Sequence, residues 1–220
     1  MKSSQAALSA RFLVFEGLDG SGKSTLIQGL AHELDSRKQT YILAREPGGT
    51  PLAEDIRKLL LRTDGEAPVA ETELLLYSAS RAQHVAKVIR PSLESGEWVL
   101  CDRFAASMVA FQSFARGLPR EIIDWLNDYA KQGIEPNLTI LLDLTVEESH
   151  RRQQGRIQAG QAGDRIERES QKFHEAVRQG FLSQANENPS AWLVLDAKQE
   201  PAQLKKQVIN ELEKRQWLKS

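Results

Sequence analysis

The chain has 220 residues, 40% of them apolar, and this length favours a single α/β domain with a substantial core. Its formal net charge of −1 argues against nucleic-acid or membrane-surface binding, and no run approaches the ~20 apolar residues of a membrane span. Because residues 1–10 have no apolar core of signal-peptide length and the lone Cys101 allows no internal disulfide, we expect a cytoplasmic protein without nucleic-acid or membrane partners.

Strands and helices are predicted to alternate along the chain. The apolar run at residues 12–15 indicates a buried strand, and further strands are predicted at 40–44, 98–101, 138–144 and 192–195. Helices are predicted at residues 24–37, 51–61, 69–94, 105–114, 118–132, 165–186 and 201–217, and a capping box at 145–148 predicts a further basic helix after it. Pro91 is expected to kink the third helix or to lie near its end. Residues 153–163 are polar and glycine-rich, which predicts a mobile loop. The alternation predicts a three-layer α/β fold with a five-stranded parallel sheet flanked by helices, in one domain spanning 1–220.

A phosphate-binding loop is predicted between the first strand and the first helix. The motif G-x-x-x-x-G-K-[ST] is matched by Gly17, Leu18, Asp19, Gly20, Ser21, Gly22, Lys23 and Ser24. Glycines let backbone N–H groups surround a polyphosphate, Lys23 reaches the β- and γ-phosphates, and the Ser24 hydroxyl is placed for Mg²⁺. Asp19 is a candidate to orient the acceptor substrate or, alternatively, stabilises the glycine turn. A turn that holds no nucleotide is the weaker interpretation, because a strand precedes the motif and a helix follows it.

Charged residues follow two other predicted strands. Arg45 lies at the carboxyl end of the second strand, and Asp102 and Arg103 lie at that of the third. Ligands bind outside these ends in open α/β sheets, so both arginines should face the phosphate loop and grip an anion. Asp102 is a candidate to orient Mg²⁺. The alternatives are that an arginine merely pairs with a carboxylate such as Glu46, and that Asp102 caps a helix or forms a salt bridge.

A basic cluster surrounds the predicted mobile loop. Its members are Arg151, Arg152, Arg156, Arg165 and Arg168. Such a cluster is often a solvated helix face. Flanking a lid at about 151–165, however, it could place an arginine on the transferring phosphoryl group and exclude water, which would otherwise hydrolyse ATP.

Several motifs together resemble the bacterial thymidylate kinase family along nearly the whole chain. They are the phosphate loop from Phe15 to Thr25, Arg45-Glu46-Pro47-Gly48-Gly49-Thr50, Ser80-Arg81-Ala82-Gln83, Asp102-Arg103-Phe104 with Ser107, and Asp164-Arg165-Ile166-Glu167. The phosphate loop alone indicates only a nucleotide enzyme. The second and fourth motifs are much more specific. The resemblance implies the P-loop NTPase fold and transfer of phosphate from ATP to dTMP with Mg²⁺, within dTTP biosynthesis.

The resemblance also implies roles for individual residues. ATP would be bound by Gly17, Leu18, Asp19, Gly20, Ser21, Gly22, Lys23, Ser24 and Thr25, and Mg²⁺ by Ser24 and Asp102. The dTMP site would comprise Asp19, Arg45, Tyr77, Arg81, Arg103, Ser107, Phe111 and Gln112. Residues of the transfer itself would be Lys23, Asp19, Arg45, Arg103 and, from the lid, Arg156 or next Arg152. Members of the family are commonly homodimers packed through long helices, and the helix after Val69 could form such a face.

The sequence departs from the family pattern at a few positions. Gly20 stands where one branch has an arginine that assists transfer, so the lid must supply that charge. Tyr77 replaces the usual Phe, Phe111 replaces the usual Tyr near the sugar, and Met108 stands where a small or polar residue is favoured. These changes leave phosphoryl transfer intact but affect discrimination of the base and the 2′ position.

Three other functions remain as alternatives. One is a kinase for another nucleoside monophosphate or another small acceptor. The second is a regulatory GTPase, which is disfavoured because the guanine-specific segment Asn-Lys-x-Asp does not occur. The third is an inactive binding protein, which is disfavoured because Lys23, Ser24 and Asp102 are all present.

Overall fold

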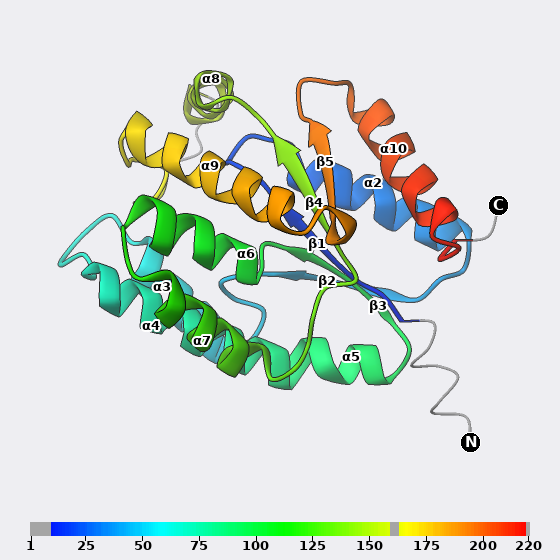
Figure 1. Ribbon diagram of the computed structural model, residues 1–220, viewed down its shortest axis with the longest axis horizontal. Coiled ribbons are helices and arrows are strands. Elements are labelled where there is room, and N and C mark those ends of the chain that lie inside the picture. Colours follow the sequence, from blue (N-terminus) through cyan, green and yellow to red (C-terminus); the bar gives the residue numbers. More distant parts are fainter. Residues whose placement is uncertain (1–9, 159–162, 219–220) are drawn as a thin grey trace.

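The computed structural model describes residues 10–158 and 163–218 (Figure 1). Five parallel strands form one sheet in the order β2-β3-β1-β4-β5. Their bounds are β1 Phe12–Glu16, β2 Tyr41–Arg45, β3 Trp98–Asp102, β4 Leu138–Asp143 and β5 Trp192–Asp196. The predicted five-stranded parallel α/β fold is confirmed, with strand bounds within one residue of those expected.

Helices cover both faces of this sheet, which is why its central strands are nearly continuous apolar runs that end in an acidic residue, rather than alternating apolar and polar. The α-helices are α2 Lys23–Ser36, α3 Pro51–Leu61, α4 Ala70–His84, α5 Arg90–Glu94, α6 Ala105–Met108, α7 Arg120–Lys131, α8 Val146–Gln158, α9 Gln171–Glu187 and α10 Pro201–Lys214. On one face, α2 and α10 pack side by side over Leu13 and Phe15 of β1 (Figure 1). The alternate residues Phe12 and Val14 face the other layer. No helix within the described ranges is long and apolar enough to cross a membrane.

The strand register brings charged residues to one edge of the sheet. Asp102 is paired both with Phe15 of β1 and with Arg45 of β2, so the carboxyl ends of three strands lie level. Glu16 is the last residue of β1, and Arg103 follows β3 directly. This edge therefore holds the strand-end residues that the sequence singled out.

Two helices contain π-helical turns that the sequence did not predict. The helix expected at residues 69–94 is continuous but consists of α4, the π-helical η1 Val85–Ile89 and α5. Pro91 lies near its end, as expected. The helix expected at residues 105–114 consists of α6 followed by the π-helical η2 Val109–Ala115. In η2, the Arg116 amide reaches back five residues to the Phe111 carbonyl, at 3.0 Å.

The prediction of a mobile loop at residues 153–163 is wrong for residues 153–158, which continue α8. Contacts with the phosphate loop explain the helix: the Ser149 hydroxyl donates to the Asp19 carbonyl at 2.7 Å, and Gln153 is buried and donates to Ser149. Residues 159–162 of the predicted loop lie outside the described ranges. The helix expected from residue 165 begins only at Gln171, because the Ser170 hydroxyl caps it by accepting from the Phe173 amide at 3.2 Å.

Candidate active site

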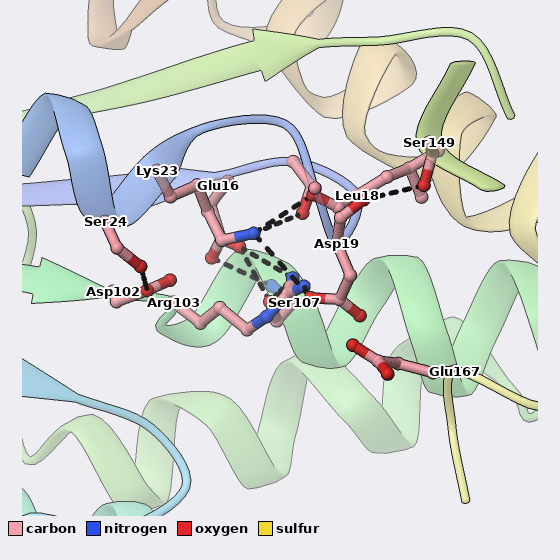
Figure 2. Close-up of polar contacts among 12 residues, drawn as sticks. Glu16, Leu18, Asp19, Lys23, Ser24, Asp102, Arg103, Ser107, Ser149 and Glu167 are labelled. Carbon is pink, nitrogen blue, oxygen red and sulfur yellow. Dashed lines mark hydrogen bonds and ion pairs between the residues drawn. The ribbon is translucent and has the colours of Figure 1, made fainter. Parts of the chain in front are cut away.

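The loop between β1 and α2 folds around the Lys23 side chain. Gly17 has a φ of 137°, and a Cβ there would lie 2.5 Å from the Leu142 carbonyl oxygen, so only glycine fits. The Lys23 side chain is buried and donates to the carbonyls of Gly17 and Leu18, both at 3.1 Å (Figure 2). The ammonium group is thus held inside the loop, with α2 beginning at Lys23 itself.

Arg103 connects the loop to the end of β3. Its guanidinium donates to Asp19 at 2.8 Å and lies 3.8 Å from Glu16 (Figure 2). Its backbone has a φ of 69°, an unusual left-handed conformation for an arginine, and strain of this kind is concentrated at functional sites. The Ser107 hydroxyl and the Phe104 amide donate to Glu16 at 2.7 and 2.9 Å, so this buried carboxylate is fully hydrogen-bonded.

The pKa values of the two carboxylates around Arg103 shift in opposite directions. Burial raises the pKa of Glu16, although the charge of Arg103 and the Ser107 hydrogen bond act against this. Desolvation also opposes ionisation of Asp19, but the positive charges of Arg103 and Lys23 outweigh it and lower its pKa to about 2. Asp19 is therefore a permanent anion at neutral pH, beside the cleft.

Asp102 and Ser24 meet at the mouth of the loop. The Ser24 hydroxyl lies 3.5 Å from Asp102 Oδ2 and donates to it, while Asp102 Oδ1 is buried and has no hydrogen-bond partner among the described residues (Figure 2). A buried carboxylate oxygen without a partner beside a hydroxyl is a suitable place for a hard cation, which prefers oxygen ligands. Within the described ranges, no cluster of three or more His, Cys, Asp or Glu side chains forms a metal site. The carboxylate and the hydroxyl offer two oxygen ligands, so a cation such as Mg²⁺ held there would take its other ligands from a bound phosphate and from water.

Two adjoining hollows form the site. The phosphate-loop cleft has a volume of about 960 Å³ and is lined by Gly20, Gly22, Lys23, Ser24, Thr25, Arg45, Asp102, Arg152 and Arg156. The aromatic cavity has a volume of about 600 Å³ and is lined by Tyr77, Arg81, Phe104, Ser107, Met108, Phe111 and Gln112. Asp19, Glu46, Arg57 and Arg103 line both. The two hollows are therefore one continuous site, charged and polar at the phosphate-loop end and lined by both aromatic and polar side chains at the other.

The arginines of this site have different partners. Arg45 lines the cleft as predicted, is half exposed and pairs with a carboxylate at 2.8 Å, which is that of Glu54 and not that of Glu46. Glu46 instead accepts from Arg81 at 2.8 Å. Arg81 is buried and also donates to the Phe104 carbonyl at 3.0 Å, so its guanidinium is held fixed at the wall of the cavity.

The predicted base-side residues come together in the aromatic cavity. Tyr77, Ser107, Phe111 and Gln112 all line it, with the Phe111 ring against the Arg103 guanidinium at 5.2 Å. Desolvation, with the negative charge of Glu73, raises the pKa of the Tyr77 hydroxyl far above its usual value, so that it stays neutral. The cavity thus offers aromatic faces and neutral polar groups.

Only some arginines of the basic cluster predicted around residues 151–168 line the cleft. Arg152 lines the cleft and donates to Glu148 and to the Gly20 carbonyl, at 2.9 and 3.1 Å. Arg156 also lines it and pairs with Glu167 at 2.9 Å. Arg151 is exposed and pairs with Glu148, while Arg165 contacts Glu73 away from the cleft.

Three charged residues in or beside the site were not singled out from the sequence. Glu16 carried a usable signal, since it is a charged residue closing an apolar strand. Arg57 lines both hollows and donates to the Pro47 carbonyl at 2.9 Å, but on α3 it reads as an ordinary solvated basic residue. Glu73 accepts hydrogen bonds from Gln112 and Arg116, which are distant in the sequence, so no local sequence pattern could indicate its role.

Comparisons with known proteins agree on one family. The family model described as thymidylate kinase matches residues 15–208. The chain is 54% identical over 209 residues to the thymidylate kinase of Bdellovibrio bacteriovorus, covering 94% of this chain and 98% of that protein. It is 48% identical over 187 residues to that of Geobacter sulfurreducens, covering 84% and 88%. A crystal structure of thymidylate kinase from Ehrlichia chaffeensis superposes with a TM-score of 0.74 at 32% identity, covering 92% and 98%.

Proposed function

Since this chain belongs to the thymidylate kinase family and phosphorylates dTMP, we propose how its residues bind the two substrates and transfer the phosphoryl group. The supporting observation is that the cleft and the aromatic cavity are continuous, sharing Asp19, Arg57 and Arg103. A nucleotide triphosphate at the loop and a nucleoside monophosphate in the cavity would bring their phosphates together at this junction. Transfer then needs positioning and charge neutralisation, without a covalent intermediate.

ATP is held at the donor end by residues 17–25. The loop amides and the amino terminus of α2 attract the phosphates, and Lys23 places a positive charge inside the loop. On binding, its ammonium would exchange carbonyl contacts for phosphate oxygens. Ser24 and Asp102 would hold Mg²⁺, which supplies further positive charge to the phosphate chain.

dTMP is held at the acceptor end. Arg45 and Arg103 bind its phosphate, with Arg57 added to them because it lines both hollows. Asp19 orients the sugar and the phosphate while fixing Arg103. The base lies in the aromatic cavity against Tyr77 and Phe111, where Arg81, Ser107 and Gln112 offer polar contacts. Arg81 donates to a carbonyl of the thymine ring.

The residues of α8 supply positive charge to the transferring group. Arg156 is the first candidate and Arg152 the second, because both line the cleft. Their partners, Glu167 and Glu148, would be exchanged for phosphate oxygens as a lid at about 151–165 closes and excludes water.

We further propose a single domain that forms a homodimer in the cytoplasm, where ATP and nucleotide precursors are found. One uninterrupted sheet supports the single domain. An exposed apolar surface on α7 supports dimer formation: Trp125 and Tyr129 are stacked at 5.7 Å and lie 65% and 73% exposed, with Ile122 beside them. Sedimentation velocity of the wild type and of Trp125→Glu tests this. A wild-type monomer at assay concentrations would contradict it.

The substrate assignment is tested by assaying dTMP, dCMP, UMP and AMP with saturating ATP or GTP. We expect the highest kcat/KM for dTMP with ATP. Preference for another monophosphate would favour a different kinase of this class, and binding of GTP in preference to ATP would favour a nucleotide-dependent switch.

A further inference from the structure

Glu73, on α4, is a buried carboxylate to which the reaction assigns no role. Its side chain is 1% exposed and accepts from Arg116 Nε at 3.1 Å and Nη2 at 3.2 Å, from Arg165 Nη2, and from Gln112 Nε2 at 3.0 Å. A carboxylate so deeply buried is costly unless every oxygen is paired, as it is here. Of its three partners, only Gln112 lines the aromatic cavity.

The charge state of Glu73 decides the orientation of the Gln112 amide. Burial opposes ionisation, but the hydrogen bonds from Arg116 and Arg165 prevail and lower the pKa of Glu73, so it is an anion at neutral pH. An ionised carboxylate only accepts hydrogen bonds, so the amide group it contacts must be the NH₂ of Gln112. The amide oxygen then occupies the other arm of the planar group. Among the described residues, no donor contacts it.

The two guanidinium groups hold Glu73 in place. Arg165 is itself anchored, since its Nε donates to the Leu60 carbonyl at 3.0 Å. Arg116 is anchored by Glu169 at 2.6 Å and by the face of the Phe173 ring at 4.5 Å. The chain of contacts therefore runs from fixed arginines through Glu73 to the cavity wall.

The direction of the Gln112 amide matters for base recognition. Neutral thymine presents a carbonyl oxygen next to an N3–H donor, whereas cytosine presents an amino donor next to an unprotonated N3. An acceptor at Gln112 matches the N3–H of thymine and opposes the lone pair of cytosine. Arg81, a donor on the same cavity, matches the thymine carbonyl.

We propose that Glu73 is a positioning residue that holds the Gln112 amide with its oxygen toward the bound base, and so makes the enzyme prefer thymine to cytosine. This inference rests on dTMP binding in the aromatic cavity, as proposed above. Glu73 acts through Gln112 and does not itself touch the substrate.

The direct test is Glu73→Gln in the full-length enzyme. A neutral amide at 73 both donates and accepts, so it no longer dictates which end of Gln112 faces the base. We expect the ratio of kcat/KM for dTMP to that for dCMP to fall by ~10-fold or more, the effect of leaving one buried polar group mismatched. An unchanged ratio in a folded variant would overturn the proposal. If dCMP turns over too slowly to be assayed, the dissociation constants of dTMP and dCMP are measured by calorimetry, and their ratio is compared between the variant and the wild type.

Arg116→Lys is the matched control. It removes the two-pronged hydrogen bond to Glu73 but keeps a positive charge, and the Glu73 carboxylate stays in contact with Gln112 and Arg165. We expect a lower melting temperature with the wild-type dTMP/dCMP ratio. If this variant changes the ratio as much as Glu73→Gln does, Glu73 has only a structural role and the proposal fails.

A second substitution keeps the test open if Glu73→Gln does not fold. Gln112→Met removes the amide and leaves both arginines with Glu73, and we expect it to lower the dTMP/dCMP ratio as well. An unaltered ratio would overturn the proposal, because Glu73 would then have no group through which to act. Adding Glu73→Gln to Gln112→Met should change the ratio no further, and an additional fall would also contradict the proposal.

The two failures are distinguishable. If the wild-type enzyme does not prefer dTMP, the substrate assignment itself is wrong. If the wild type prefers dTMP and Glu73→Gln retains that preference, only the role of Glu73 is wrong.

Discussion

The acceptor end and the donor end of the site hold their arginines in different ways. At the acceptor end, Arg81 is 2% exposed and bound to Glu46, while Arg103 is mostly buried between Asp19 and Glu16. At the donor end, Arg156 is 43% exposed and pairs with Glu167. Arg81 and Arg103 are therefore part of the core, whereas Arg156 lies on the surface of α8.

This difference matches what each end must do. Buried ion pairs are costly to break, so Arg81 and Arg103 keep one geometry and can define the position of dTMP. Exposed ion pairs contribute about 0–1 kcal/mol, so Arg156 can exchange Glu167 for a phosphate oxygen at little cost. Substitution of Arg103 should therefore affect stability and activity together, and substitution of Arg156 should affect activity alone.

The largest effect is expected at Lys23, inside the phosphate loop at the donor end. Lys23→Ala removes positive charge from the transition state and should lower kcat by ~10³-fold. Steady-state turnover with ATP and dTMP measures this. Turnover close to that of the wild type would exclude the assigned role of Lys23.

Arg103→Ala tests the acceptor end. It should lower kcat/KM for dTMP by ~10²-fold, the usual cost of removing one partner of a buried charge pair. The free energy of unfolding should also fall by about 3 kcal/mol, near the low end for such a pair because Glu16 keeps its other hydrogen bonds. Urea denaturation measures the second effect, and a variant as stable as the wild type would contradict the comparison.

Arg156→Ala tests the donor end. Because Arg152 and Lys23 remain, kcat should fall by ~10-fold, more than KM for dTMP rises. The melting temperature should stay unchanged, in contrast with Arg103→Ala. An unchanged kcat would transfer the role to Arg152 or remove it from α8.

The smallest effect is confined to acid. The pKa of Asp19 falls from 3.8 to about 2 on folding, so its stabilising contribution is complete above pH 4 and is lost as the pH falls through 2. Linkage gives a total of about 2 kcal/mol, of which about 1 kcal/mol is lost by pH 3. We expect the free energy of unfolding of Asp19→Asn, measured by urea denaturation at pH 5, 4 and 3, to fall less with decreasing pH than that of the wild type. If the free energies of the two proteins fall in parallel between pH 5 and pH 3, the prediction is wrong.

The sequence predicted the parts of the site that depend on local or strand-end patterns. The phosphate loop is contiguous, and Arg45, Asp102 and Arg103 follow apolar strands whose carboxyl ends must lie together in a parallel sheet. The fold followed from the alternation of strands and helices in the same way. These features were predictable because neighbours in the chain determine them.

The features that escaped prediction depend on distant contacts. Residues 153–158 are polar and contain a glycine, yet they are helical because Gln153 and Ser149 dock against the phosphate loop. Glu73 meets Arg116 and Arg165, which lie 43 and 92 residues further along. The π-helical turns of η1 and η2 could not be predicted either, because the spacing of apolar residues does not distinguish them from ordinary α-helix.

The widened turn η2 makes the length of this segment as important as its composition. Phe111 and Gln112 are adjacent in the chain, and both face the cavity from a turn that closes over five residues. Deleting one residue between 113 and 115 would let the segment tighten to ordinary helical winding, rotating every side chain before it relative to those after it. Substitutions on the side of this turn that faces away from the cavity can therefore accumulate one at a time during evolution. A single insertion or deletion, in contrast, would change which side chains contact the nucleobase.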